Sequence, residues 1–147
     1  MFRGRYEHTI DPKGRVSIPS RFRELLVTHY EEEKLIITNC DNALWAYPLK
    51  EWRAIEEKVA QLPQFKPEVK TLQRFFIAAA VECLVDKQGR ILIPPTLRDY
   101  AGLSKDVVLV GMTHRIEIWS TERWQKIFSD AERDMGSMGD KLADLGL

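Results

Sequence analysis

Short apolar runs bounded by turn-forming residues recur along the chain, and such runs predict β-strands. We expect single strands at 6–10, 15–18, 81–85 and 90–93, and strand pairs within 35–47 and 107–119. The pairs turn at "NCDN" and "GMTH". These eight strands lie in two clusters of similar order, so the pattern predicts a mostly β core.

Three other segments carry apolar residues at helical spacing, which predicts amphipathic helices that cover a core or pack against another subunit. The stripes are Trp52, Ile55, Val59 and Leu62; Val69, Leu72, Phe76 and Ala79–Ala80; and Trp124, Ile127, Phe128 and Ala131. Two short helices are expected after Pro19 and Pro94, with Ser20 as the N-cap of the first and Gly102 as the C-cap of the second. Strands and helices together predict an α+β fold with flanking helices.

The chain contains an internal duplication. The segment "DPKGRVSIPSRFRE" (11–24) aligns with "DKQGRILIPPTLRD" (86–99) with six identities in fourteen positions. The elements that follow recur in the same order, ending at Trp52 and at Trp124. We therefore divide the chain into a first repeat (1–54), a helical connector (55–80), a second repeat (81–124) and a C-terminal helix with an acidic tail (125–147).

Each repeated phrase begins with a turn. Asp11 and Asp86 are suited to accept hydrogen bonds from the backbone that follows them. Gly14 and Gly89 can adopt the positive φ that such turns require. We expect these four residues to form the structural turns.

Charge is unevenly distributed although lysines and arginines balance acids at 22 each. Residues 1–26 hold six cations against three acids, whereas residues 129–147 hold five acids against two cations. A basic face with an acidic tail is typical of a binding protein, and also of a solvated surface. No apolar run is long enough to span a membrane, and the N-terminus lacks the apolar core of a signal peptide. We expect a cytoplasmic protein.

Catalysis is the weakest of the function classes. Asp11 and Asp86 could be paired acids and the three histidines could be bases, but no nucleophile elbow, phosphate loop or zinc motif organises them. Cys40 and Cys83 are isolated, which argues against a disulfide or a metal site. We expect no enzyme activity, no cofactor and no metal.

Binding is better supported, because Lys13 and Arg15 leave the first turn and Arg90 leaves the second. A guanidinium is suited to bidentate contact with phosphate or with a guanine edge. The alternative is that each Asp and the Arg four residues later form a surface ion pair, worth less than about 1 kcal/mol. The residues alone leave both interpretations open.

The repeated pattern, Asp-x-x-Gly-Arg followed by an apolar residue, any residue, Ile and Pro, resembles the AbrB-type (swapped-hairpin) DNA-binding unit. Two such units occur together with "MFRG", "YPLKEW", "GLSKDVVLVG" and "EIWSTERW". Over essentially its whole length, the chain is similar to the MraZ family of bacterial transcriptional regulators.

The resemblance implies a duplicated AbrB-type swapped-hairpin β-barrel in which one chain forms an intramolecular pseudo-dimer. It implies a ring-like homo-oligomer, cytoplasmic and nucleoid-associated, with no membrane or small-molecule partner. The expected partner is double-stranded DNA carrying short direct repeats, ahead of the division and cell-wall gene cluster and the protein's own gene. The alternative is an AbrB-type antitoxin or a protein-interaction scaffold, although antitoxins of this type usually carry one copy and a disordered tail.

By the same resemblance, Asp11 and Arg15 match the first motif, Asp86 and Arg90 match the second, and Arg23 and Arg98 match the arginine of the following helix. The residues expected to contact DNA are Arg3, Arg5, Lys13, Gly14, Arg15, Arg21, Arg23, Lys87 and Arg90. Because the first repeat carries more cations than the second, we expect it to supply more of the DNA contact.

Overall fold

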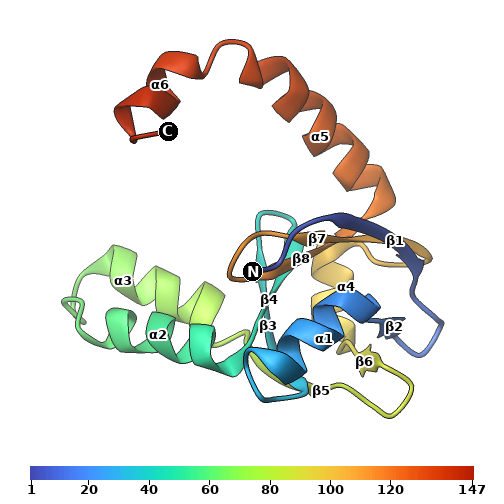
Figure 1. The fold of residues 1–147 in the computed structure, drawn as a ribbon. Helices are drawn as coiled ribbons and strands as arrows, with labels where there is room; N and C mark the ends of the chain where they lie inside the picture. Colours follow the sequence, from blue (N-terminus) through green and yellow to red (C-terminus); the bar gives the residue numbers. More distant parts are fainter.

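The computed structural model describes residues 1–147 and contains two antiparallel sheets and six α-helices (Figure 1). The larger sheet has six strands in the order β1-β7-β8-β4-β3-β5, and the smaller pairs β2 with β6. The strands are β1 (Arg5–Thr9), β2 (Arg15–Ser17), β3 (Lys34–Cys40), β4 (Ala43–Tyr47), β5 (Val81–Leu84), β6 (Arg90–Leu92), β7 (Asp106–Gly111) and β8 (Ile116–Ser120). The α+β class and the mostly β core predicted from the sequence are confirmed.

Strands of one repeat pair mainly with strands of the other. β1 pairs with β7, β5 with β3, β2 with β6 and β4 with β8; only β3–β4 and β7–β8 pair within a repeat. The two strands that flank each Asp-Gly turn lie in different sheets, so they do not form a hairpin ladder with each other. One isolated bridge, Ile10 to Val16, is their only pairing in the first repeat.

The register of these ladders shows an approximate two-fold relation between the repeats. Tyr6 opposes Leu109, and the equivalent residues of the other repeat, Val81 and Ile37, also oppose each other. Val16 opposes Ile91, its own equivalent, at the centre of the two-stranded ribbon. Each repeat therefore completes the other.

One core joins both repeats. Twenty buried residues, among them Phe22 and Leu97 of the short helices, fill the space under one face of the large sheet. The helices here are α1 (Ser20–Thr28) and α4 (Pro95–Ala101). The opposite face of the sheet is also covered in part, which explains why β3 is apolar on both faces rather than alternating.

The ends of the short helices agree only partly with the prediction. Ser20 as N-cap is wrong: the cap is Pro19, whose carbonyl accepts from the amides of Phe22 and Arg23 at 2.9 and 3.0 Å, so that Ser20 is already helical. Gly102 as C-cap of α4 is confirmed, with φ 65° and ψ 34°.

Residues 49–77, which include most of the predicted connector (55–80), form α2 (Leu49–Ala60), α3 (Pro67–Leu72) and a π-helical turn, η1 (Gln73–Ile77). The expected stripes are buried at Trp52 and Phe76, but Leu72 is exposed. The helix widens there because side chains of β3 hold its carbonyls: Thr38 Oγ1 donates to the oxygen of Phe76 at 2.6 Å. The second predicted stripe assumed a regular α-helix, and the contact with the sheet changes the helix at this point.

The C-terminal segment forms α5 (Thr121–Met135) and α6 (Gly139–Asp144), which contain no buried residue. Figure 1 shows them as an arm that leaves the sheet and curves over it at a distance. Ser120 caps α5 by accepting from the amide of Arg123 at 3.2 Å. No helix of the protein has both the length and the apolar character needed to cross a membrane.

Candidate nucleic-acid interface

The two Asp-Gly turns are built in the same way. Oδ1 of Asp11 accepts from the amides of Lys13 and Arg15 at 3.0 and 2.9 Å. Oδ1 of Asp86 accepts from the amides two and four residues later at 2.8 and 2.9 Å. Gly14 and Gly89 have φ of 93° and 77°, a conformation that residues with a β-carbon rarely adopt. The predicted turn roles of these four residues are consistent with this geometry.

The aspartates are held in their charged form. The amide of Arg15 lowers the pKa of Asp11, with a further contribution from its guanidinium, and Arg90 has the same effect on the pKa of Asp86. The ion pairs use Nε: it lies 2.6 Å from Asp11 Oδ2 in Arg15 and 3.4 Å from Asp86 Oδ2 in Arg90. The terminal nitrogens of both guanidinium groups make no hydrogen bond within the chain, so the ion pair orients each arginine and leaves its outer edge free for a ligand.

Each turn is clamped by the other repeat. The amide of Ile93 donates to the oxygen of Gly14 at 2.9 Å, and the amide of Ile18 donates to the oxygen of Gly89 at 2.8 Å. Arg23 lies directly over Gly89, where a β-carbon would come within 2.5 Å of its guanidinium.

Arg98 occupies the same place over Gly14, at 2.7 Å from such a β-carbon. The Nε atoms of Arg23 and Arg98 each donate at 3.0 Å to a carbonyl of the preceding strand end, that of Ile18 and that of Ile93. Both helix arginines therefore hold the turn of the opposite repeat in place.

The ribbon of β2 and β6 presents the motif arginines outward. Val16 and Ile91 oppose each other and point into the core, each 1% exposed. Because side chains alternate along a strand, Arg15 and Arg90 lie on the opposite, outer face. They are diagonal neighbours across the ribbon, and in standard sheet geometry the Cα atoms of such neighbours lie about 7–8 Å apart.

Two further residues share this outer face, and the sequence-based set did not include them. Ser17 opposes Arg90 and Leu92 opposes Arg15. Leu92 is 58% exposed on this face, beside Arg15. The alternation of side chains around Val16 and Ile91 would identify Ser17 and Leu92 once β2 is known to pair with β6.

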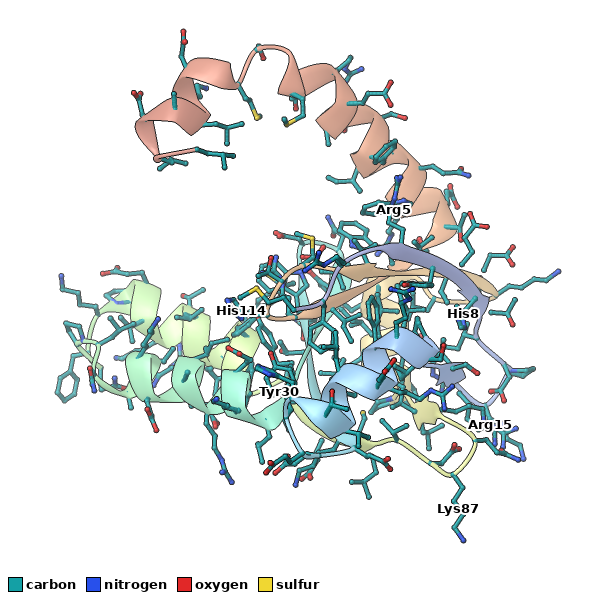
Figure 2. The ribbon with its side chains drawn as sticks, in the orientation of Figure 1. Arg5, His8, Arg15, Tyr30, Lys87 and His114 are labelled. Carbon is teal, nitrogen blue, oxygen red and sulfur yellow. The ribbon has the colours of Figure 1, made fainter.

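The remaining predicted cations divide into two groups. Lys13 and Lys87 lie on the two turns, and Figure 2 shows Arg15 and Lys87 at the same end of the molecule. Arg5 lies elsewhere, against α5, with its guanidinium 4.6 Å from the ring centre of Phe128.

Arg3 and Arg21 line a separate hollow beside α1. The structure thus places Lys13, Arg15, Lys87 and Arg90 on the β2–β6 ribbon and on the turns at its two ends, apart from Arg3, Arg5 and Arg21.

The histidines considered as catalytic bases are dispersed. Figure 2 shows His8 and His114 on different sides of the molecule. His114 Nδ1 is 3.4 Å from Glu51, and partial burial lowers the pKa of His8. No group of three histidine, cysteine, aspartate or glutamate side chains is placed to hold a metal ion.

The outer face is chemically suited to a polyanion. Four cations surround a narrow two-stranded ribbon whose two acids are already bonded to the backbone. A ribbon of this kind fits the major groove of DNA, where guanidinium groups can contact guanine edges or phosphates.

Comparison with known proteins agrees with the duplication. The family model described as "MraZ protein, putative antitoxin-like" matches the chain twice, at residues 1–75 and 76–142. Proteins named "Transcriptional regulator MraZ" from Caldicellulosiruptor saccharolyticus and Desulfitobacterium hafniense are 47% and 48% identical over 148 residues, covering the whole of both chains. The protein of that name from Acetivibrio thermocellus is 47% identical with the same coverage. The chain therefore belongs to the MraZ family.

Proposed function

We propose that this protein is a DNA-binding transcriptional regulator that contacts double-stranded DNA through the outer face of the β2–β6 ribbon. The observation that supports it most is the pair of outward arginines, Arg15 and Arg90, each oriented by an aspartate on a clamped turn. The relatives' shared name, transcriptional regulator, points the same way. Such a protein acts on the chromosome in the cytoplasm, at the nucleoid.

The fold in this proposal is a duplicated AbrB-type swapped-hairpin unit, in which one chain forms the pseudo-dimer. The exchange of strands between the repeats supports it, because β2 pairs with β6 and each edge strand pairs with the opposite repeat. The proposed division remains repeats at 1–54 and 81–124, connector at 55–80 and tail at 125–147, and the exchange supports its two-repeat plan without fixing the bounds.

The main contacts are assigned to Lys13, Gly14, Arg15, Lys87 and Arg90. Arg3 and Arg21 would add phosphate contacts at the border, whereas the positions of Arg5 and Arg23 favour structural roles. The first repeat supplies more of the contact in this proposal, since it has Arg21 where the second has Thr96.

The proposed target is a set of short direct repeats ahead of the division and cell-wall gene cluster, including the protein's own gene, bound by a ring-like homo-oligomer. A neutral chain has few phosphate contacts to offer by itself. A ring aligns several ribbons along one DNA, and the effective concentration of each further contact raises the affinity without a basic chain.

A second candidate, an antitoxin or interaction scaffold, is favoured by the description of the family model as antitoxin-like. It predicts a protein bound in stoichiometric amount when the chain is purified from its own cells, and no preference for one DNA sequence.

The test is binding of the full chain to its own upstream DNA, measured by fluorescence anisotropy over a series of salt concentrations. We expect affinity to fall steeply with salt and to exceed that for a scrambled duplex of equal length. Salt-independent binding, or equal affinity for both duplexes, would contradict the proposal.

A further inference from the structure

Helix α5 has an apolar face that the chain covers only in part: the guanidinium of Arg5 lies over Phe128. Its stripe includes Trp124, Ile127 and Phe128, and the latter two are 43% and 39% exposed. Trp124 contacts the sheet beside Trp119, with ring centres 6.0 Å apart. Figure 1 shows no second helix alongside α5.

The two-fold relation between the repeats shows what such a helix normally packs against. α2 is the equivalent of α5: Trp52 follows Tyr47 by five residues, as Trp124 follows Trp119. Trp52 is only 4% exposed, because Phe76 of η1 covers it at 5.5 Å between ring centres. No aromatic residue from another helix performs this function for α5.

A hollow of about 380 Å³ lies beside the exposed part of α5. Trp119 and Ile127 line it, together with Arg123 and Asp130 of α5 and with the β3–β4 turn. Two of its seven lining residues, Trp119 and Ile127, are apolar and the others are polar or charged. An aromatic ring entering the hollow could contact this apolar pair.

The same chain displays an exposed aromatic residue. Phe65, in the loop between α2 and α3, is 91% exposed. Gln64 fixes this loop: its Nε2 donates to the oxygen of Leu62 at 2.6 Å, and its Oε1 accepts from Gln73 at 2.6 Å. In Figure 1 the loop lies at the far end of the α2–α3 hairpin, remote from α5, so Phe65 cannot fill the hollow of its own chain.

The charges of the two surfaces are complementary. The α2–η1 segment, residues 49–77, has six cations and four acids, whereas the α5–α6 arm, residues 121–144, has six acids and four cations. Lys66 and Lys70 flank Phe65, and Lys70 lies over its ring at 6.0 Å.

We propose that Phe65 of one copy docks into the hollow beside Trp119 and Ile127 of α5 in the next copy. The contact joins two different surfaces, and head-to-tail contacts of this kind close into rings when the rotation permits. The interface rests on the ring assembly proposed above and specifies which surfaces form it. Aromatic anchors in a pocket are typical of the residues that dominate interface energy.

Two substitutions at exposed positions test this by native mass spectrometry of the full chain. Phe65→Ser removes the anchor, and Ile127→Lys blocks the hollow. We expect the wild type to be an oligomer and each variant to be a single chain. An equimolar mixture should give dimers with one copy of each variant, because one intact junction then remains. Leu84→Ser, at a residue 69% exposed in β5, is the matched control and should assemble as the wild type does.

Oligomers in either single variant, or a mixture that yields no dimer, would overturn the interface. A wild type that is a single chain would overturn it together with the ring. DNA binding is measured separately. If the variants dissociate as expected but the wild type shows no preference for its upstream DNA, the proposed function is contradicted and the interface remains supported.

Discussion

At the scale of single residues, the two motif glycines are the most constrained positions on the proposed interface. Each has a positive φ, and each lies under a guanidinium from the other repeat. The repeats are therefore in contact at the turns as well as in the core, and a change of one atom there affects both.

Replacing Gly89 by alanine tests this constraint. We expect Gly89→Ala to lower the free energy of unfolding by about 1–3 kcal/mol, the usual cost of a β-carbon at such a backbone conformation. Urea unfolding measures it. Adding Arg23→Ala to this variant should recover only the part of the lost stability that arises from the clash between the new β-carbon and the Arg23 guanidinium. The control is Gly136→Ala, where φ is −63° and the nearest atom is 3.9 Å away, so that stability should change little.

The motif aspartates predict a pH dependence. Their folded-state pKa values lie below the ordinary value of 3.8. A carboxyl of this kind contributes stability above its unfolded-state pKa, and the contribution disappears as the pH falls through the lower folded-state value. The difference in unfolding free energy between the wild type and Asp86→Asn should therefore shrink as the pH is lowered from 7 through 3.8 and below. A constant difference at every pH would contradict this.

At the scale of elements, the β2–β6 ribbon combines a buried centre with a charged outer face. Val16 and Ile91 anchor it, so the outer residues can change without loss of the core.

For this reason Arg15→Ala should weaken binding to the upstream DNA by about tenfold to a hundredfold, the usual value of one good base contact. Assembly should be unchanged. Arg90→Ala should cost less, because the first repeat carries more cations than the second, among them Arg21 at the position of Thr96. Fluorescence anisotropy measures both, and Arg53→Ala on α2 serves as a control of equal charge change. Equal losses for Arg15→Ala and Arg90→Ala would contradict the asymmetry.

Several elements could be predicted from the sequence because their causes are local. The strands follow from apolar patterning, and the turn at Asp11 and the cap at Gly102 follow from side-chain chemistry within a few residues. The π-helical turn could not be predicted, since it depends on Thr38 of a strand about forty residues away in sequence. The contact between Arg5 and Phe128 was missed for the same reason.

At the scale of the whole molecule, the pattern of alternation did not reveal which strands would pair. β1 pairs with β7 across about a hundred residues of chain, although the nearest strand in sequence is β2. Alternation specifies the buried face of a strand and not its neighbour. The duplication was visible in the sequence, but the exchange of strands between the repeats required the structure.

Because each repeat lends strands to the other, neither should fold as a monomer. Fragments 1–75 and 76–147, made separately, should lack the cooperative unfolding of the full chain or form dimers. Mixing them should restore a one-to-one complex with the full-length circular dichroism spectrum. A folded, monomeric fragment 1–75, shown by sedimentation and by dispersed amide resonances, would contradict this.

The approximate two-fold relation has a consequence for reading DNA that carries direct repeats. A fully symmetric ribbon would bind a site equally well in two orientations that differ by a half-turn, and could not distinguish the upstream side of a site from the downstream side. A direct repeat has a direction. On the proposed target, we therefore expect the positions where the repeats differ, Lys13 against Gln88 and Arg21 against Thr96, to determine the polarity with which each chain binds.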